Sequence, residues 1–127
     1  MPEQAERNKD VVRRLVAEVL NGGCLDVLDE LFAPELVTSA RDWISPFRVA
    51  FPDVHMEIHD LIAEGNVVAA RYTCSATHLH PWLGHAPTGR RFESIDEVSI
   101  YRFHNGQITD SWGIEDNLER LAQLGLR

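Results

Sequence analysis

The sequence has few cysteines, a shortage of basic residues and no long hydrophobic run, and each shortage excludes a class of protein. Its two cysteines, Cys24 and Cys74, fit no zinc or redox spacing, so we expect free thiols in a reducing compartment. Lysine and arginine total 12 against 20 acidic residues, a net charge of −8 that argues against nucleic acid or an anionic membrane as partner. No apolar run approaches the roughly 18 residues of a membrane helix, and the first residues are polar, so we expect a cytoplasmic protein.

The composition is that of an ordinary globular protein. The 127 residues are 44% hydrophobic and 25% charged, enough for one packed core, and we expect a single domain over residues 1–127. Residues 87–91 lack the glycine spacing of a phosphate loop, and no motif indicates a cofactor.

Hydrophobic periodicity predicts three helices in the first 51 residues. A helical repeat of apolar residues covers residues 8–21 and a second covers residues 25–32, where Pro34 stops the pattern. A third helix is predicted over residues 41–51, with Pro46 near its start or at a kink. After Pro52 the period changes to two, which predicts a strand from residue 54 and further strands over 67–80, 91–103 and 108–115.

Turn and capping signals complete the expected architecture. Asn105 and Gly106 are typical of a tight hairpin, and Asp116 with Glu119 predicts the capped start of a short helix over residues 117–124. Helices followed by an antiparallel meander give an α+β fold with the helices on one face of a curved sheet.

Both faces of the predicted sheet carry apolar side chains. On the third strand, Val98 and Ile100 point to one face, whereas Ile95, Tyr101 and Phe103 point to the other. Helices can cover one of these faces. We predict that a second copy of the chain covers the other face, in a homodimer.

Several short motifs resemble those of one family. They are Phe51-Pro52-Asp53, Thr77-His78, Pro87-Thr88-Gly89-Arg90-Arg91-Phe92, Asn105-Gly106-Gln107-Ile108 and Gln123-Leu124-Gly125. Over about residues 10–125 the chain resembles the SnoaL-type polyketide cyclases, which have the nuclear-transport-factor-two-like cone fold. The resemblance implies that the helices and the concave face of the sheet enclose an apolar pocket for a small-molecule substrate.

The catalytic pair that the resemblance implies is missing. The family closes a ring by an aldol step, with an Asp on the last strand and a His on the preceding strand. These positions are Gly113 and Ser99 here, and neither side chain can transfer a proton at neutral pH. The chain therefore uses other residues, performs other chemistry, or performs none.

We expect Glu97 and His78 to replace that pair. The resemblance implies that Ser99 and Gly113 face the pocket, and strand alternation then places Glu97 on the same side. Desolvation there would raise its pKa toward the range of a general base, with His78 as acid or oxyanion donor. Tyr72 and Ser99 would orient the substrate. Further residues expected at the pocket are Trp43, Cys74, Tyr101, Ser111, Gly113 and Glu115.

Other interpretations of the same residues remain open. Glu97 could pair with an arginine such as Arg71 or Arg90, and His78 could bond a backbone carbonyl. The histidines at 78, 80 and 85 invite a metal interpretation, but no carboxylate lies at a companion spacing. The leading hypothesis is a cofactor-free cyclase, isomerase or lyase acting by proton transfer on an apolar, oxygenated, polyketide-like molecule. The alternatives are a non-catalytic binder, or an epoxide-opening or hydrating enzyme that needs a second carboxylate beside Glu97.

Overall fold

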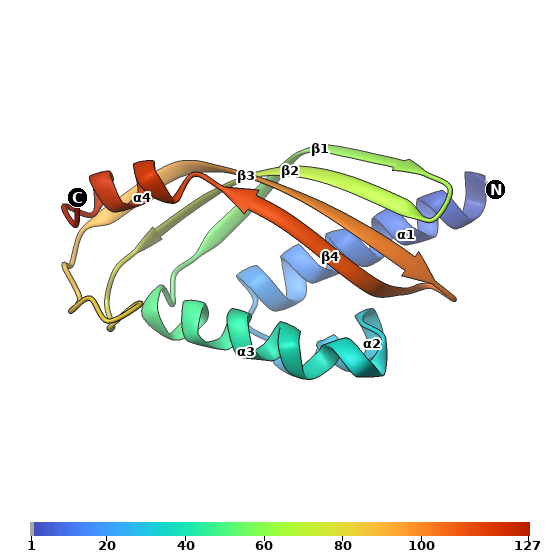
Figure 1. Ribbon diagram of the computed structural model, residues 1–127, viewed down its shortest axis with the longest axis horizontal. Helices are drawn as coiled ribbons and strands as arrows, with labels where there is room; N and C mark the ends of the chain where they lie inside the picture. The colour runs from blue at the N-terminus through green and yellow to red at the C-terminus, as the bar shows by residue number, and fades with distance from the viewer. Residues whose placement is uncertain (1) are drawn as a thin grey trace.

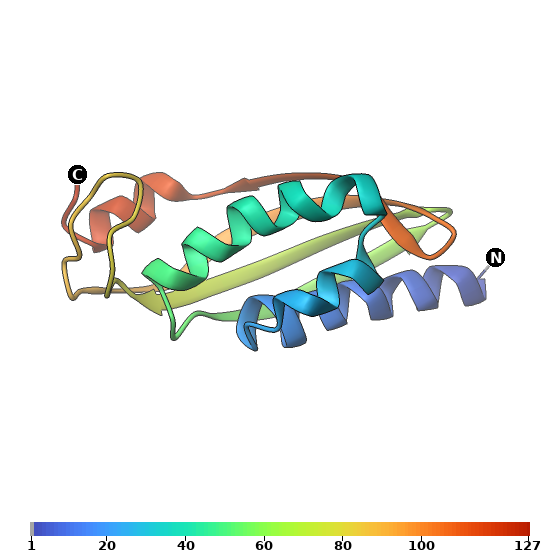
Figure 2. The ribbon, with the colours of Figure 1, turned by 90° about the horizontal axis from the view of Figure 1, so that it is seen from below.

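Four antiparallel strands form one sheet, with the helices packed across one of its faces. The computed structural model describes residues 2–127, so Met1 of the predicted domain lies outside the described residues. The sheet has the order β1-β2-β3-β4. Helices α1 (Pro2–Arg14) and α3 (Pro34–Ala50) lie on the same face (Figure 1, Figure 2). The predicted α+β architecture is confirmed, with strands β1 (His55–Glu64), β2 (Val67–Thr77), β3 (Arg91–His104) and β4 (Gln107–Glu115).

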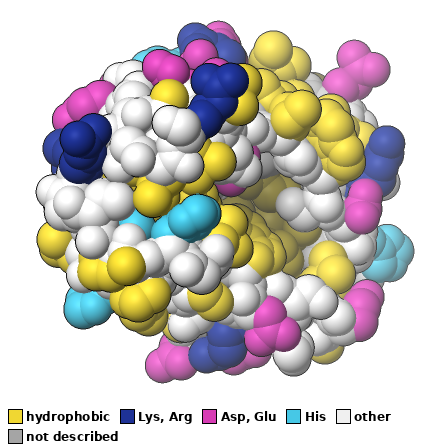
Figure 3. Space-filling model, turned by 60° about the vertical axis from the view of Figure 1, so that its left-hand side comes forward, with side chains coloured by type: hydrophobic (Ala, Val, Ile, Leu, Met, Phe, Trp, Pro, Cys, Tyr) yellow, Lys and Arg dark blue, Asp and Glu magenta, His cyan; other side chains and the backbone are white. Residues whose placement is uncertain are grey.

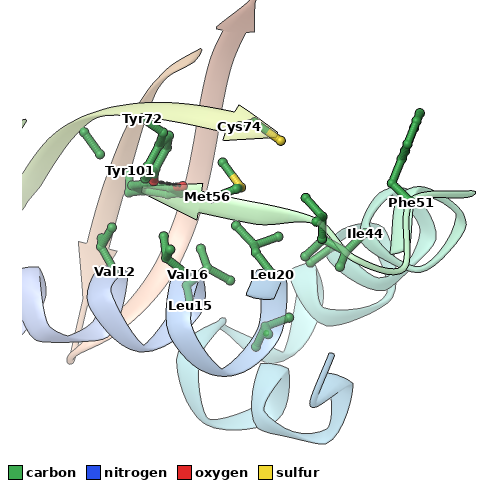
Figure 4. Packing of buried hydrophobic residues seen from close by; sticks show 14 of the residues in the cluster. Val12, Leu15, Val16, Leu20, Ile44, Phe51, Met56, Tyr72, Cys74 and Tyr101 are labelled. Carbon is green, nitrogen blue, oxygen red and sulfur yellow. Dashed lines mark hydrogen bonds between the residues drawn. The ribbon is translucent and has the colours of Figure 1, made fainter. Parts of the chain in front are cut away.

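The first helix is longer than its apolar repeat. It starts at Pro2 and continues from α1 into the π-helical segment η1 (Leu15–Asn21), which ends at the predicted position. Its first two turns carry no apolar face, and side-chain pairs such as Gln4 with Asn8 and Glu6 with Lys9 support them instead. Its apolar face packs against the sheet and supplies a large part of the core (Figure 4).

The helices on either side of Pro34 differ from the prediction. The predicted second helix is a short 3-10 turn, η2 (Leu25–Val27), followed by α2 (Leu28–Leu31). Pro34 then opens α3 at its first turn, where a missing N–H costs nothing, so this helix begins before the predicted residue 41. Pro46 lies inside α3, and buried Ile44 and Ala50 on either side of it hold the helix against the core.

The strands alternate as predicted, and three irregularities in register bend the sheet. The breaks lie at Ile58/Asp60, Cys74/Ala76 and Arg102/Phe103. Asn105 and Gly106 both adopt positive φ in the β3–β4 turn, which confirms the predicted hairpin.

Strand β2 ends at Thr77 and not at residue 80. A loop over residues 78–90 begins there, closed by the hydrogen bonds from His78 N–H to the Arg90 carbonyl and from Gly89 N–H to the His78 carbonyl. The loop lies beside α4 (Asn117–Gln123) at one end of the sheet (Figure 1). The predicted capping of α4 is confirmed, because the Asp116 side chain accepts a hydrogen bond from Glu119 N–H at 3.1 Å. None of the helices over residues 2–127 is both long and apolar enough to cross a membrane.

Candidate functional site

A cavity of about 440 Å³ lies between α3, the inner face of the sheet and residues 81–83 of the loop. Side chains from α3 and the loop give it apolar walls, among them Ile44, Phe47 and Trp82. Its polar lining residues on the sheet are Tyr72, Glu97, Ser99, Tyr101 and Glu115, and Asp42 and Arg48 of α3 and Asn117 also line it. Figure 3 views the molecule from this end and shows a hollow lined largely by hydrophobic side chains. An apolar enclosure with a few converging polar groups is the usual form of a small-molecule site.

A second cavity of about 390 Å³ lies between α3 and β4. Ser39, Asp110, Ser111 and Gly113 line it but do not line the first cavity. The two cavities share five residues, which are Trp43, Glu97, Ser99, Tyr101 and Glu115. Glu97 therefore lies where the two spaces meet.

Glu97 is held by a buried arginine on α4. The Nη2 of Arg120 donates to Glu97 Oε2 at 2.7 Å, and its Nη1 donates to Glu115 Oε1 at 2.9 Å and to Asn117 Oδ1. Glu97 and Glu115 are direct cross-strand neighbours on β3 and β4. One guanidinium thus bridges two carboxylates, of which Glu97 is 13% exposed and Glu115 is 38% exposed.

Aromatic rings enclose the guanidinium of Arg120. Its Cζ lies 4.8 Å from the ring centroid of Phe92, 5.4 Å from that of Phe47 and 5.9 Å from that of Trp82. The side chain is completely buried, and its Nε has no hydrogen-bond partner among the described residues. Cation–π contacts and two carboxylates compensate for its removal from water.

Sequence reasoning missed Arg120. It named Arg71 or Arg90 as partners for Glu97, but Arg71 pairs with Asp60 instead, 2.7 Å away. The one signal in the sequence is spacing: Arg120 lies four residues before Leu124, the residue that caps α4, and in the structure both are fully buried on the same face.

The surroundings of Glu97 raise its pKa to about 7. Burial is the largest cause and the negative charge of Glu115 adds to it, while Arg120 acts in the opposite direction. A carboxyl group with this pKa is partly protonated at neutral pH. It can therefore take a proton from a substrate or return one.

Two tyrosines stand beside Glu97. Tyr72 is the cross-strand neighbour of Glu97 on β2, and its hydroxyl lies 2.6 Å from that of Tyr101. Burial raises the pKa of both phenols, so both keep their protons at neutral pH. The pair can therefore donate a hydrogen bond to an oxygen atom in the cavity.

The structure does not bring His78 into the cavity with Glu97. His78 is fully buried but lines neither cavity, and its ring packs 5.3 Å from that of Phe51. Its Nδ1 accepts a hydrogen bond from Thr88 N–H at 3.2 Å, and burial lowers its pKa. Strand β2 ends at Thr77, so His78 already belongs to the loop. Its imidazole hydrogen-bonds to Thr88 near the other end of the loop and does not face either cavity.

All the other predicted pocket residues except Cys74 line one cavity or both. Trp43 lines both, while Ser111 and Gly113 line only the second cavity. Cys74 is buried behind the lining, and burial raises the pKa of its thiol to about 12. Within residues 2–127, no three His, Cys, Asp or Glu side chains are arranged to hold a metal ion.

Helices packed on one face of a curved four-stranded sheet, with a cavity between them, are the nuclear-transport-factor-two-like fold. Among proteins of this fold, the chain belongs to the SnoaL-like polyketide cyclase family, whose model matches residues 10–124. It is 31% identical over 120 residues to the aklanonic acid methyl ester cyclase DnrD of Streptomyces peucetius, covering 94% of this chain and 80% of that protein.

Solved structures share the same architecture. TsrD of Streptomyces laurentii superposes with a TM-score of 0.88 at 26% identity, covering 96% of this chain and 97% of that one. IdmH of Streptomyces antibioticus superposes with a TM-score of 0.81 at 29% identity, covering 93% of this chain and 98% of that one. The likeness therefore extends over almost the whole length of each protein.

Proposed function

We propose that this chain is a cytoplasmic, cofactor-independent cyclase or isomerase that moves a proton with Glu97. Its substrate is an apolar, oxygenated small molecule of the polyketide type. The observation that carries the proposal is the position of Glu97, a carboxyl group with a pKa of about 7 that lines a mainly apolar cavity beside a pair of tyrosine hydroxyls. Membership of a polyketide cyclase family and a relative that is an aklanonic acid methyl ester cyclase support the substrate class.

The residues around the cavity suggest a mechanism. The Glu97 carboxylate takes a proton from a carbon next to a carbonyl group, so the C–H bond breaks and an O–H bond forms on Glu97. The electron pair moves onto the carbonyl oxygen, which accepts a hydrogen bond from the Tyr72 and Tyr101 hydroxyl pair. In a cyclisation the enolate carbon attacks a second carbonyl of the same molecule, and the alkoxide that forms takes the proton back from Glu97. In an isomerisation Glu97 returns the proton to another carbon atom.

Proton abstraction can be measured without the natural substrate. We expect the protein to accelerate exchange of the C–H protons beside the carbonyl of 2-tetralone in D2O, followed by NMR. The Glu97→Gln variant removes the base and should reduce the accelerated rate by about 100-fold or more. Glu93→Gln is the matched control, because Glu93 is an exposed acid on the same strand that lines neither cavity. Equal exchange by wild type and Glu97→Gln would contradict the proposal, and 2-tetralone binding without accelerated exchange would favour a non-catalytic binder.

One observation favours a second candidate function, epoxide opening or hydration. Glu97 and Glu115 both line the two cavities and both bind Arg120, which meets the requirement for a second carboxylate. In that reaction one carboxylate takes a proton from water, the resulting hydroxide attacks an epoxide carbon, and the other group, protonated, gives its proton to the epoxide oxygen. Conversion of styrene oxide to its diol, without exchange of 2-tetralone, would identify this function.

We further propose that the chain is a homodimer through the outer face of the sheet. The register aligns Ile62, Ala69, Ile100 and Trp112 in one row across the four strands, and Ile62 and Trp112 are 66% and 55% exposed. A second copy would remove this apolar row from water.

We expect sedimentation to give a mass near twice 14.4 kDa for the wild-type protein. The Trp112→Asp variant places a charge in the row and should be monomeric. Val49→Asp, at an exposed apolar residue on α3, should remain dimeric. A monomeric wild-type protein at micromolar concentration would contradict the proposal.

A further inference from the structure

The ligand space on the two sides of Glu97 differs in chemical character. The first cavity is bounded mainly by apolar and aromatic side chains of α3, the sheet and the loop. The second cavity adds the serines Ser39 and Ser111 to the shared acids Glu97 and Glu115, beside apolar residues of α3 such as Leu36.

Two small residues lie side by side at the boundary between the cavities. Ser99 and Gly113 are direct cross-strand neighbours at the point where the cavities meet. A Cβ atom at position 113 would lie 3.1 Å from Ser99 Oγ and 3.3 Å from the Val98 carbonyl oxygen, tighter than ordinary van der Waals contact. A larger side chain at either position would therefore crowd the other, and the space between α3 and β4 depends on both being small.

The lining of the second cavity selects the kind of group that can enter it. Among the described residues, its lining includes no lysine, arginine or histidine, and Glu97 and Glu115 supply carboxylates. Serine hydroxyls and carboxylates accept hydrogen bonds, so the cavity suits groups that donate them. An anionic group would meet acidic side chains without an accessible cation, because Arg120 is completely buried.

We propose that the second cavity is a subsite for a hydroxylated or amine-bearing arm of the ligand. The ligand is then a two-part molecule, with an apolar ring system in the first cavity and an uncharged or cationic, donor-rich arm in the second. The group that reacts lies between them, beside Glu97. This assignment of substrate class rests on the proposed function for the placement of the reacting group, whereas the arm specificity can be measured by binding alone.

Naphthalene probes with different arms test the subsite by calorimetry. The set is 1-ethylnaphthalene, 2-(1-naphthyl)ethanol, N-(1-naphthyl)ethylenediamine and 1-naphthylacetate. We expect the alcohol and the amine to bind about tenfold or more tightly than 1-ethylnaphthalene, as hydrogen bonds to carboxylates allow, and the acetate to bind more weakly than all three. Equal affinities across the set, or tightest binding of the acetate, would overturn the proposal.

Variants that fill the second cavity test whether the preference for the alcohol and the amine arises there. Ser111→Phe on β4 and Ser39→Phe on α3 place a ring in the cavity from opposite walls, and either should abolish the preference for the alcohol and the amine. Thr38→Phe is the matched control, because Thr38 is an exposed neighbour of Ser39 that lines neither cavity. A preference that survives both filling variants would overturn the subsite.

The two proposals fail in distinguishable ways. Exchange of 2-tetralone that depends on Glu97, without any arm preference, overturns the subsite and leaves the proton-transfer function standing. An arm preference that the filling variants abolish, without exchange of 2-tetralone, supports the subsite in a protein that does not perform the proposed proton transfer.

Discussion

Replacing Arg120 with methionine is expected to lower the free energy of unfolding by about 3–5 kcal/mol, the cost of removing one partner from a buried ion pair. The change leaves Glu97 and Glu115 beside each other without their shared cation, and Glu97 is 13% exposed. Native domains are stable by only about 5–15 kcal/mol, so much of this protein's stability depends on one side chain of α4. Urea denaturation followed by tryptophan fluorescence measures the difference.

Two further variants test whether the loss of stability comes from the unpaired carboxylates. Arg120→Met combined with Glu97→Gln and Glu115→Gln removes the uncompensated charges and should recover most of the lost stability. Arg13→Met is the matched control, since Arg13 pairs with Asp10 at 2.6 Å on the exposed face of α1, where an ion pair contributes less than about 1 kcal/mol. A loss for Arg120→Met no greater than that for Arg13→Met would contradict the prediction that the two carboxylates depend on Arg120.

The raised pKa of Glu97 should make the free energy of unfolding depend on pH. Its pKa is about 7 in the folded protein against 4.5 as the reference value, so between these pH values the folded state keeps a proton that the unfolded state has released. The free energy of unfolding contributed by this group therefore falls as pH rises through that window and is constant above it. The full change amounts to about 3 kcal/mol.

The contribution of Glu97 must be measured as a difference between proteins. Burial lowers the pKa of His78, so His78 binds a proton more readily in the unfolded state and makes stability rise with pH up to about 6.5, in the opposite direction. Subtracting the Glu97→Gln curve from the wild-type curve cancels the contribution of His78. A wild-type minus variant difference that stays constant from pH 4.5 to pH 8 would contradict the raised pKa of Glu97.

Local sequence patterns were sufficient to predict the sheet, and the resemblance at Ser99 and Gly113 indicated which of its faces is the inner one. Alternation with period two places Tyr72 and Glu97 on the inner face, and the register sets them directly opposite each other. The hairpin at Asn105 and Gly106 was readable because few residues accept its backbone conformation. The start of α3 was not, because Pro34 is compatible both with the end of one helix and with the start of the next.

The partners of the site residues could not be deduced in the same way. Arg120 lies 23 residues after Glu97, and their contact depends on how α4 packs against the end of the sheet. His78 has the correct strand parity for the pocket, yet the chain leaves the strand one residue earlier and the ring turns away. Contacts of this kind depend on tertiary packing, which alternation and capping signals do not describe.

The aromatic enclosure of Arg120 also determines how the site responds to its medium. Dissolved ions weaken an electrostatic interaction only where they can approach the charges, over a Debye length of about 8 Å at physiological ionic strength. Phe47, Trp82 and Phe92 cover the guanidinium, so counterions cannot reach it. The acidic exterior of this protein is therefore sensitive to ionic strength, whereas the field that Arg120 exerts on Glu97 stays nearly the same from dilute buffer to concentrated salt.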